Sequence, residues 1–394
     1  MSLALRPYQK AASDAAVAFF LEEDKRKHKY CGGLIVLPTG TGKSFLIADI
    51  AHRLNAPILI FCPSKEILEQ NYDKMERIEK GVSTMYSASG GQKRISMITF
   101  ATIGSAIRHM DDFDVFRYVM VDEAHGVSAD GGMYERFIHH REDRKVVGLT
   151  ATPYRLDRDT LKFLTRTRPR IFGKMLYYCQ ITDMVSQGFL ADLMYYDLTA
   201  IDMGNIRSNS TGSDYDDKSI IAEYERSGFY DKLFNTTMRV LSPKDGTKRK
   251  GILVFTRFIK EAEILKDKLV ERGIKAAIVT GDTPKRERED IISRFKGGRI
   301  DVVTNAMTLT TGFDYPELDT IIMARPTKSL SLYYQCVGRA IRPSRGKNAW
   351  VIDRCGSYRR FGKVSDLKIG LEKPNSELWA VFSRGRKLTN TIII

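Results

Sequence analysis

The run Pro38-Thr-Gly-Thr-Gly-Lys-Ser44 places two glycines, a lysine and a hydroxyl between an apolar run and a helical pattern. Glycines let the main chain approach a phosphate, and the N–H groups at a helix start face the anion. Lys43 can reach terminal phosphates, and Ser44 can bind Mg²⁺. Leu37 stands where the general pattern has its first glycine, and a glycine-rich turn without a ligand is the alternative. The sequence favours a site for a nucleoside triphosphate and magnesium.

Two adjacent carboxylates end another apolar run further along, in Tyr118-Val-Met-Val-Asp-Glu-Ala-His125. Neighbouring acids at the end of a buried strand repel each other and are costly to bury unless a cation compensates. A metal-bound Asp122 and a water-activating Glu123 account for that cost. His125 could lie on a surface helix, but its position favours a coupling role.

Three further blocks carry polar residues after apolar runs: Leu149-Thr-Ala-Thr-Pro153, Leu309-Thr-Thr-Gly-Phe-Asp314 and Gln335-Cys-Val-Gly-Arg-Ala-Ile-Arg342. The last block puts two arginines three residues apart, and we expect them on one helical face. An arginine delivered across a cleft to a phosphoryl group raises its transfer rate by about 10³–10⁵. We therefore expect hydrolysis that depends on closure of a second domain.

These blocks, in this order, resemble the motifs of superfamily 2 DNA helicases with a DEAH box, over roughly residues 3–355. Within that superfamily the chain is most similar to the RadD-like branch, near the type III restriction and UvsW-like enzymes. The segments that carry this similarity are Leu5–Gln9, Val279–Pro284, Leu309–Asp314 and Arg325–Tyr333. RadD proteins continue into a cysteine-rich segment that is not found here, so we expect a compact, phage-encoded member.

The resemblance implies a role for individual residues. Arg6 and Gln9 would recognise adenine, with an ordinary helix start as the alternative. The nucleotide would be bound by Thr39, Gly40, Thr41, Gly42, Lys43 and Ser44, and from the second domain by Gly312 and Asp314. Catalysis would use Lys43, Glu123, Gln335, Arg339 and Arg342, with Mg²⁺ on Ser44 and Asp122. Coupling of hydrolysis to movement would involve His125, Thr150 and Thr152.

The resemblance also implies a surface for the nucleic-acid backbone. Its residues would be Ser64, Lys65, Thr99, Phe100, Thr256, Arg257, Thr280, Gly281 and Thr304. Hydroxyls, main-chain amides and a few cations suit phosphate contacts without readout of bases, as a motor that moves along any sequence requires. For each of them, an ordinary strand-end or turn residue is an equal alternative.

Short apolar runs alternate with helical patterns in both halves, which is typical of parallel sheets with helical crossovers. In the first half we predict strands at 34–37, 58–61, 97–99, 118–121 and 146–149, with a helix at 44–54. In the second half we predict strands at 252–255, 276–279, 301–304, 320–323 and 349–352, with helices at 260–271, 285–295 and 331–337. The pattern predicts the α/β class with two parallel sheets. The resemblance implies that these are two RecA-like parallel-sheet domains in tandem, with an ATP cleft between them.

We expect residues 1–160 to form the ATP-binding domain and residues 242–364 the domain with the arginine fingers. Residues 161–241 would connect them, and residues 365–394 would form a basic tail. Within the connection, residues 204–217 are rich in glycine, serine and asparagine, which predicts a mobile loop. A strand-splitting hairpin is the alternative for that loop, although its aspartates argue against contact with phosphates.

Composition narrows the class of protein. The 394 residues hold 43% hydrophobic and 28% charged residues, which excludes general disorder and a collagen-like fibre. Lys and Arg number 63 against 48 Asp and Glu, a net charge of +15. Residues 1–240 hold 32 basic and 31 acidic residues, so the remainder holds 31 and 17, a net of +14. Such a segment is typical of a polyanion binder, with solvated surface charge as the alternative.

The remaining features concern location and partners. No apolar run approaches the roughly 18 residues of a membrane helix, and no signal peptide is evident. We expect a cytoplasmic protein of a bacterial cell or phage-infected host, with no membrane partner. The five cysteines lack ligand spacing, so we expect reduced thiols and no zinc.

The sequence thus predicts a monomer that uses ATP and Mg²⁺ to move on and unwind or remodel forked, branched or single-stranded DNA. Repair, recombination and branch migration are the expected settings. A translocase that does not separate strands, an RNA helicase and a non-catalytic clamp are the alternatives.

Overall fold

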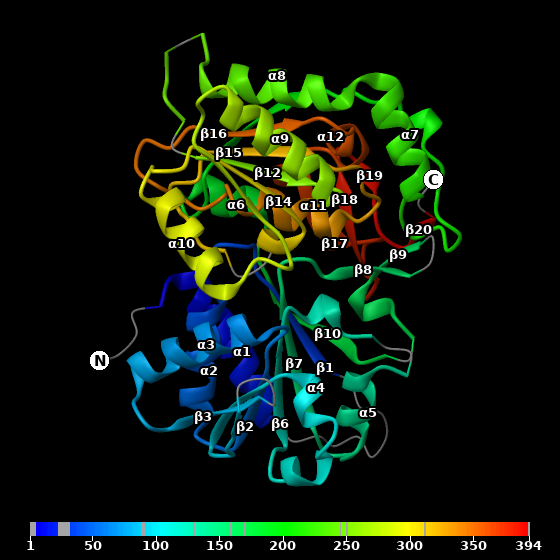
Figure 1. Cartoon of the computed structure of the whole chain (residues 1–394). Coiled ribbons are helices and arrows are strands. Elements are labelled where there is room, and N and C mark those ends of the chain that lie inside the picture. The colour runs from blue at the N-terminus through cyan, green and yellow to red at the C-terminus, as the bar shows by residue number, and fades with distance from the viewer. Residues whose placement is uncertain are drawn as a thin grey trace. The chain divides into compact units, whose positions relative to one another are not determined.

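The computed structural model describes residues 5–22, 32–87, 91–128, 131–157, 160–168, 170–244, 246–249, 251–310 and 313–392 (Figure 1). The chain forms two compact units. The first unit contains Met1–Arg155, Lys162–Gln180 and Ile369–Val381, and the second contains Leu156–Leu161, Ile181–Lys368 and Phe382–Ile394. Within the described ranges, the helices are too short or too polar to cross a membrane.

The first unit is built on an eight-stranded sheet with the order β10-β1-β7-β6-β2-β5-β3-β4. Its strands are β1 (Gly32–Val36), β2 (Ile58–Phe61), β3 (Ser83–Ser87), β4 (Gln92–Lys93), β5 (Ile98–Ala101), β6 (Tyr118–Asp122), β7 (Lys145–Thr150) and β10 (Phe172–Tyr178). All neighbouring pairs are parallel except β3 with β4. The central strands are almost wholly buried, as strands covered on both faces must be.

Helices connect the strands of the first unit. They are α1 (Pro7–Leu21), α2 (Lys43–Leu54), α3 (Lys65–Ile78), α4 (Ile103–Ala106) and α5 (Met133–His139), with 3₁₀ turns η2 (Met110–Phe113), η3 (Ala124–Gly126) and η4 (Leu164–Arg166). Helix α2 packs against both α1 and α3. Because β1 and β2 are parallel, α2 must carry the chain from the carboxyl end of β1 back to the amino end of β2. The first turn of α2 therefore lies at the carboxyl end of β1.

The second unit is built on a six-stranded parallel sheet with the order β11-β16-β15-β12-β14-β13. Its strands are β11 (Leu193–Asp197), β12 (Ile252–Thr256), β13 (Ala276–Val279), β14 (Val302–Ala306), β15 (Thr320–Ala324) and β16 (Ala349–Asp353). Helices and 3₁₀ turns of this unit are α6 (Ile181–Ser186), η5 (Met203–Asn205), α7 (Asp217–Ser227), α8 (Phe229–Leu241), α9 (Ile259–Glu271), α10 (Lys285–Lys296), η6 (Thr308–Thr310), α11 (Leu330–Val337), α12 (Ser357–Phe361) and η7 (Val364–Asp366).

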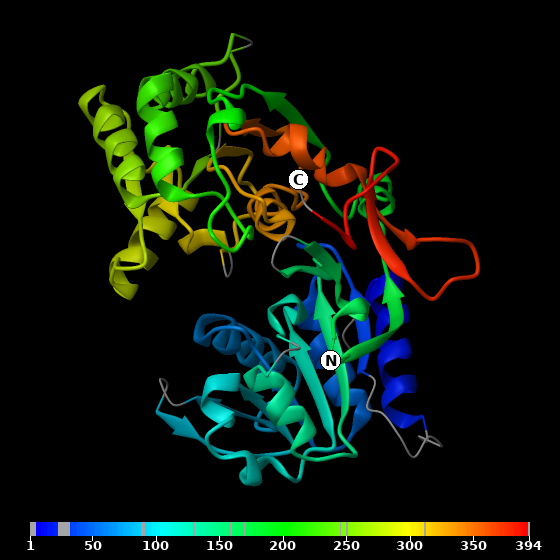
Figure 2. The same ribbon diagram turned by 90° about the vertical axis from the view of Figure 1, so that its right-hand side faces the viewer.

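The core of the second unit lies between its sheet and α7, α8 and α9, which Figure 2 shows side by side in green to yellow-green. Tyr224 of α7 stacks on Phe229 of α8 with ring centroids 4.1 Å apart. Both rings are buried together with Leu265 of α9 and Val254 of β12. Aromatic stacking and apolar burial thus hold these helices to the sheet.

Two small sheets complete the chain, with the orders β17-β18-β19 and β20-β9-β8. Their strands are β8 (Tyr154–Asp157), β9 (Thr160–Phe163), β17 (Leu367–Leu371), β18 (Trp379–Ser383), β19 (Arg386–Lys387) and β20 (Thr391–Ile392).

The predicted α/β class and the two parallel sheets are confirmed, and each predicted strand lies in or overlaps an observed one. The division of the chain is less simple than expected. The presumed connection contributes β10 to the first sheet and β11 to the second, and residues 367–392 form strands rather than a plain tail. Within the predicted mobile loop 204–217, residues 207–216 form a hydrogen-bonded hairpin, since Ser208 and Tyr215 form a β-bridge.

Candidate active site

The segment between β1 and α2 turns at two glycines. Gly40 and Gly42 have φ of 86° and 83°, which glycine adopts without strain. A Cβ at Gly42 would also lie 2.6 Å from Nε2 of Gln9. Because α2 begins at Lys43, the N–H groups of its first residues point toward this segment. The arrangement fits a cradle for phosphates.

The remaining residues of this segment stabilise the turn. The Thr41 hydroxyl donates to the carbonyl of Pro38 at 2.6 Å, and Thr39 is buried. Ser44 is partly exposed in the first turn of α2. The N–H of Leu37 donates to the carbonyl of Thr150 at 3.0 Å, so main-chain pairing of β1 with β7 continues past the end of the strand. An extended, buried residue at position 37 explains the departure from the glycine of the general pattern.

Helix α1 holds the turn in place. Oη of Tyr8 and Nε2 of Gln9 both donate to the carbonyl of Thr41, at 2.9 and 2.8 Å. Oε1 of Gln9 accepts from the main-chain N–H of Arg6 at 2.9 Å, so both ends of the amide have protein partners. Arg6 is exposed, with Nη1 3.3 Å from Oη of Tyr8. The structure therefore brings the expected pair to the turn and adds Tyr8, which we missed although it lies between them in the sequence.

The two adjacent acids diverge at the carboxyl end of β6. Glu123 has φ 52° and ψ 52°, a conformation that costs a non-glycine residue about 1 kcal/mol or more and is concentrated at functional sites. Its Oε1 lies 3.6 Å from Nζ of Lys43, and its Oε2 lies 3.3 Å from Nδ1 of His125. The strained main chain thus turns Glu123 toward the lysine while Asp122 stays within the sheet.

The three predicted coupling residues form a chain with Glu123. Nδ1 of His125 lies 3.1 Å from Oγ1 of Thr150, at the end of β7. That hydroxyl donates to the carbonyl of Thr152 and accepts from its N–H at 3.0 Å. A change at Glu123 can therefore pass through His125 to the segment that leaves the sheet after β7.

Asp122 is buried and accepts two hydrogen bonds. Nδ2 of Asn71 donates to its Oδ2 at 3.0 Å, and the N–H of Glu123 donates to its Oδ1 at 3.0 Å. Burial, and next the charge of Glu123, raise the pKa of Asp122 to about 6, while Lys43 and Asn71 oppose the rise. A bound cation would offset the cost of this buried charge, which fits the predicted metal ligand.

Asn71 is a site residue that sequence reasoning missed. It lies on the buried face of α3 together with Leu68 and Met75. An amide in an otherwise apolar stripe at helical spacing needs a polar partner, and that was the available signal.

The second unit carries the remaining predicted nucleotide-binding residues. Arg342 forms an ion pair with Asp314. Nη1 of Arg339 donates to the carbonyl of Phe313 at 2.6 Å, and its Nε lies 3.4 Å from the carbonyl of Gln335. Burial lowers the pKa of Arg342, opposed by Asp314. Gly312 lies outside the described residues.

One expectation about these arginines is wrong. Helix α11 ends at Val337, before either arginine, so they do not share a helical face. The N–H groups of Arg339 and Ala340 pair with carbonyls three residues earlier, so the chain continues in tight turns.

Four of the residues predicted to contact nucleic acid have buried side chains, namely Thr99, Phe100, Thr256 and Thr304. The hydroxyls of these threonines donate inside the protein, to the carbonyls of Ser96, Phe258 and Ala262. The prediction that these four side chains contact phosphates is therefore wrong, because strand residues near the centre of a covered sheet point into its layers. Their main-chain groups are not affected by this correction.

The other predicted contacts lie nearer the surface. Ser64 caps α3 by accepting from the N–H of Ile67 at 3.3 Å, and Lys65 follows it. Thr280 and Gly281 lie in the turn after β13, where the Thr280 hydroxyl accepts from the N–H of Asp282. Arg257 directly follows β12 and forms ion pairs with two aspartates.

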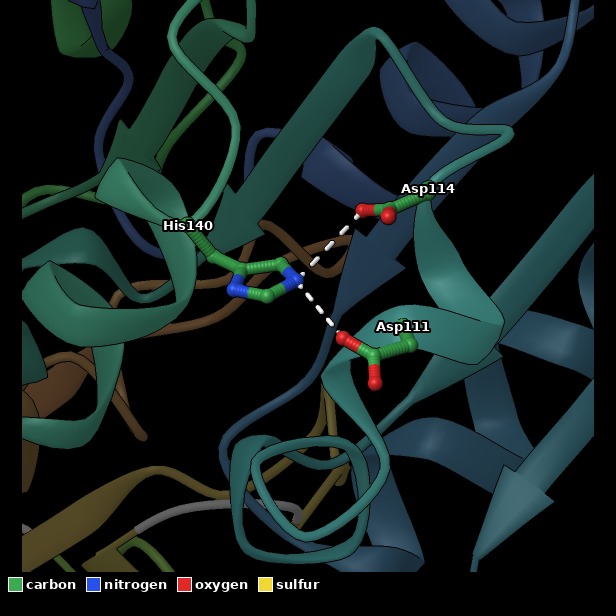
Figure 3. A group of neighbouring side chains, drawn as sticks. All are labelled: Asp111, Asp114 and His140. Carbon is green, nitrogen blue, oxygen red and sulfur yellow. Dashed lines mark ion pairs between the residues drawn. The ribbon is translucent and has the colours of Figure 1, made fainter.

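One group among the described residues has the donors for a metal ion away from this site. Nε2 of His140 lies 3.0 Å from Oδ1 of Asp111 and 3.7 Å from Oδ1 of Asp114, as Figure 3 shows. All three side chains are at the surface, and Nη2 of Arg144 lies 3.4 Å from the same Oδ1 of Asp114. The arginine already supplies positive charge there, so we assign no metal to this group.

Comparison with known families identifies the two units. Residues 2–155 match the family model described as "Type III restriction enzyme, res subunit", and residues 232–344 match "Helicase conserved C-terminal domain". The chain belongs to superfamily 2 of the helicases. Helicases of this superfamily hydrolyse ATP, and the similarity to the type III restriction enzymes expected from the motifs is confirmed.

Individual relatives support this membership. A 51.5 kDa protein of Lactococcus phage (isolate 7-9) is 26% identical over 84% of this helicase and 67% of its own length. The "Putative ATP-dependent helicase IRC3" of Saccharomyces cerevisiae is 25% identical over 90% of this helicase and 52% of its own length. The helicase thus spans about half to two thirds of these relatives.

A solved structure shares the fold. The type ISP restriction-modification enzyme LlaBIII, bound to DNA, superposes with a TM-score of 0.65 at 20% identity, over 90% of this helicase and 28% of that chain. The predicted tandem RecA-like domains are therefore confirmed as the fold.

Proposed function

We propose that this helicase couples hydrolysis of Mg-ATP to movement on DNA and to unwinding or remodelling of forked or branched DNA. The observation that carries the proposal is the chain of contacts from Lys43 through Glu123 and His125 to Thr150. Such a chain joins a phosphate cradle to the segment that follows β7, which is what conversion of hydrolysis into movement requires.

Different residues of the first unit would bind the phosphates, hold the metal ion and activate the water. The turn at Gly40 and Gly42 would wrap the phosphates, and Lys43 would contact the terminal ones. Ser44 and Asp122 would hold Mg²⁺, which when bound neutralises charge on the phosphates. Glu123 would orient the attacking water and receive its proton.

Oε1 of Glu123 lies 3.6 Å from Nζ of Lys43. Phosphates entering the cradle would attract the lysine away from this carboxylate. Glu123 would then be released from the lysine to face the attacking water.

The second unit would supply positive charge to the transition state. Arg339 and Arg342 are the fingers in this proposal, with Gln335 near the terminal phosphate and Asp314 meeting the nucleotide. Both arginines have internal partners, Phe313 and Asp314. A nucleotide would have to compete with these partners, so hydrolysis would be slow without the nucleic acid that favours closure.

Two observations favour nucleic acid, and DNA in particular, as the track. Residues 241–394 carry the net charge of +14 derived above, which suits a polyanion. The type III restriction family model and the DNA-bound LlaBIII belong to proteins of DNA metabolism.

Phosphate release with and without nucleic acid tests the proposal. Single-stranded, duplex, forked and four-way DNA should stimulate release by the purified chain, and equivalent RNAs should stimulate it less. Strand release should be followed in parallel on forked and four-way DNA. Stimulation by RNA alone would contradict a DNA track, and stimulation without strand release would identify a translocase that does not unwind.

A further inference from the structure

Residues 207–216 form a hairpin, which we call the acidic hairpin. The β-bridge between Ser208 and Tyr215 closes it, and the N–H of Asn209 donates to the carbonyl of Asp214 at 2.8 Å. Tyr215 and the preceding Ile206 are buried in the core of the second unit. The base of the hairpin is therefore fixed, and its tip carries polar residues.

The carboxylate of Asp214 lies between two donors. Its Oδ2 is 2.6 Å from Nη1 of Arg257, and its Oδ1 accepts from the main-chain N–H of Lys328 at 3.0 Å. Arg257 directly follows β12, and Lys328 comes four residues after the end of β15, the neighbouring parallel strand. The carboxyl edge of parallel strands is where α/β proteins bind ligands.

These donors are of the kind that binds phosphate. A guanidinium and a main-chain N–H that converge on one oxyanion are a common donor set for phosphate oxygens. Two further cations lie close by. Nζ of Lys328 donates to the hydroxyl of Ser208 at 2.6 Å, and the buried Arg325 is near enough to Arg257 for their charges to repel each other. The carboxylate of Asp214 occupies the position that a phosphate oxygen pair would take.

A second carboxylate has a different position on the same arginine. Oδ1 of Asp217, in the first turn of α7, accepts from Nε and Nη2 of Arg257 at 3.0 and 2.8 Å. Asp217 therefore fixes the guanidinium plane on the side away from Nη1. Rotation of the Asp214 side chain alone would free Nη1 of Arg257 and the N–H of Lys328 while Asp217 kept the arginine oriented.

We propose that Nη1 of Arg257 and the N–H of Lys328 form a binding site for one backbone phosphate of DNA, and that Asp214 fills this site when no DNA is bound. The inference rests on the proposed function, since it concerns the regulation of one DNA contact of that helicase, at the Arg257 that the resemblance already implied. DNA has to displace Asp214, so the measured affinity is lower than the intrinsic affinity by the fraction of molecules with the site open.

The substitution Asp214→Asn tests this site. Asparagine keeps an oxygen that can accept from Lys328 but loses the charge that attracts Arg257. We expect a dissociation constant for a labelled thymidine oligonucleotide about tenfold lower than that of the wild type at low salt, because one charge-assisted hydrogen bond no longer competes. Fluorescence anisotropy over a series of salt concentrations measures it.

The matched control is Asp231→Asn on α8. Asp231 forms an ion pair with Lys268, so this substitution makes the same change of net charge in the same unit by breaking an ion pair that the proposed site does not use. If Asp214 masks a phosphate site, D214N tightens binding more than D231N does. Because bound DNA contacts the same phosphate in the wild type and in D214N, the slope of log K against log salt should be alike in the two proteins. Equal affinities in the two variants would overturn the proposal.

A variant that lacks Arg257 tests whether this residue is the one that binds the phosphate. In an Arg257→Ala protein, Asp214→Asn should give no gain beyond that of Asp231→Asn, and a persisting gain would overturn the role of Arg257. If D214N does not fold, as judged by circular dichroism, Asp214→Ser replaces it with the same expected and contradicting outcomes. Wild-type protein whose phosphate release DNA does not stimulate would refute the proposed function, whereas stimulated wild type with equal variants would refute this site alone.

Discussion

Replacing Asn71 by leucine removes the donor to Asp122 while keeping the number and branching of the side-chain heavy atoms. The lost bond is a buried one to a charged acceptor, at 3.0 Å. Such bonds contribute about 1.5–3 kcal/mol to the free energy of unfolding. At pH 8 we expect the free energy of unfolding of Asn71→Leu to be lower than that of the wild type by an amount in that range. Urea denaturation without nucleotide measures it.

The same substitution has a characteristic pH dependence. Asn71 lowers the pKa of Asp122, which burial raises to about 6, so its loss raises that pKa further. A carboxyl with a raised pKa in the folded state destabilises the fold when ionised, and protonation relieves the cost. The stability deficit of Asn71→Leu should therefore be largest at pH 8 and shrink as the pH falls toward 5.

Magnesium binding gives a second measure of Asn71. Loss of a residue that orients a metal ligand typically lowers metal affinity by about 10–100-fold, so calorimetric titration should show weaker binding of Mg-ATP. Gln70→Leu, an amide-to-leucine change at an exposed position of α3, is the matched control and should leave the affinity for Mg-ATP near wild type. Wild-type stability at pH 8 together with wild-type affinity for Mg-ATP would refute the role assigned to Asn71.

Three other predictions follow from individual positions. Gly42→Ala should abolish ATP binding in equilibrium dialysis, because its Cβ would lie 2.6 Å from Gln9 and its φ is 83°; retained binding would contradict a rigid cradle. Arg339→Ala should lower DNA-stimulated phosphate release by about 10³-fold with a smaller change in ATP affinity, and unchanged turnover would exclude the finger role. Burial raises the pKa of Glu261 to about 8, so its ionisation destabilises the fold as the pH rises from about 4.5 to 8. Glu261→Gln should accordingly gain stability over wild type at pH 8, and a gain as large at pH 5 would contradict this assignment.

The sequence predicted the parts of the fold that depend on local pattern. The strands at 58–61 and 276–279 have the predicted bounds because they are short, apolar and flanked by turn residues. It did not predict that β10 joins the first sheet and β11 the second. Strand order depends on long-range pairing, and a partly exposed strand such as Phe172–Tyr178 lacks the continuous apolar run of a central strand.

The sequence predicted the parts of the site for which residue type alone determines the chemistry. It did not predict the direction in which each side chain points. The motifs brought Lys43, Glu123, His125 and Thr150 together as expected. The sequence could not show that the Thr304 hydroxyl donates to the carbonyl of Ala262, because the layer into which a strand residue points depends on register.

Some residues bind protein groups where we had expected them to bind a ligand. Gln9 holds the phosphate turn through its amide, and Arg257 is paired with two aspartates of a segment 40 residues away. Polar side chains bond to whatever the fold brings near, and that is a property of tertiary structure rather than of a motif.

The central claim is that Glu123 drives hydrolysis of ATP in a helicase that DNA activates. Phosphate release by the wild type and by Glu123→Gln, each with and without forked DNA, tests it most directly, with ATP binding measured in parallel. We expect forked DNA to accelerate release by the wild type, while Glu123→Gln binds ATP and DNA but releases almost no phosphate. Release by Glu123→Gln at the wild-type rate, or a wild-type rate that forked DNA leaves unchanged, would contradict the claim.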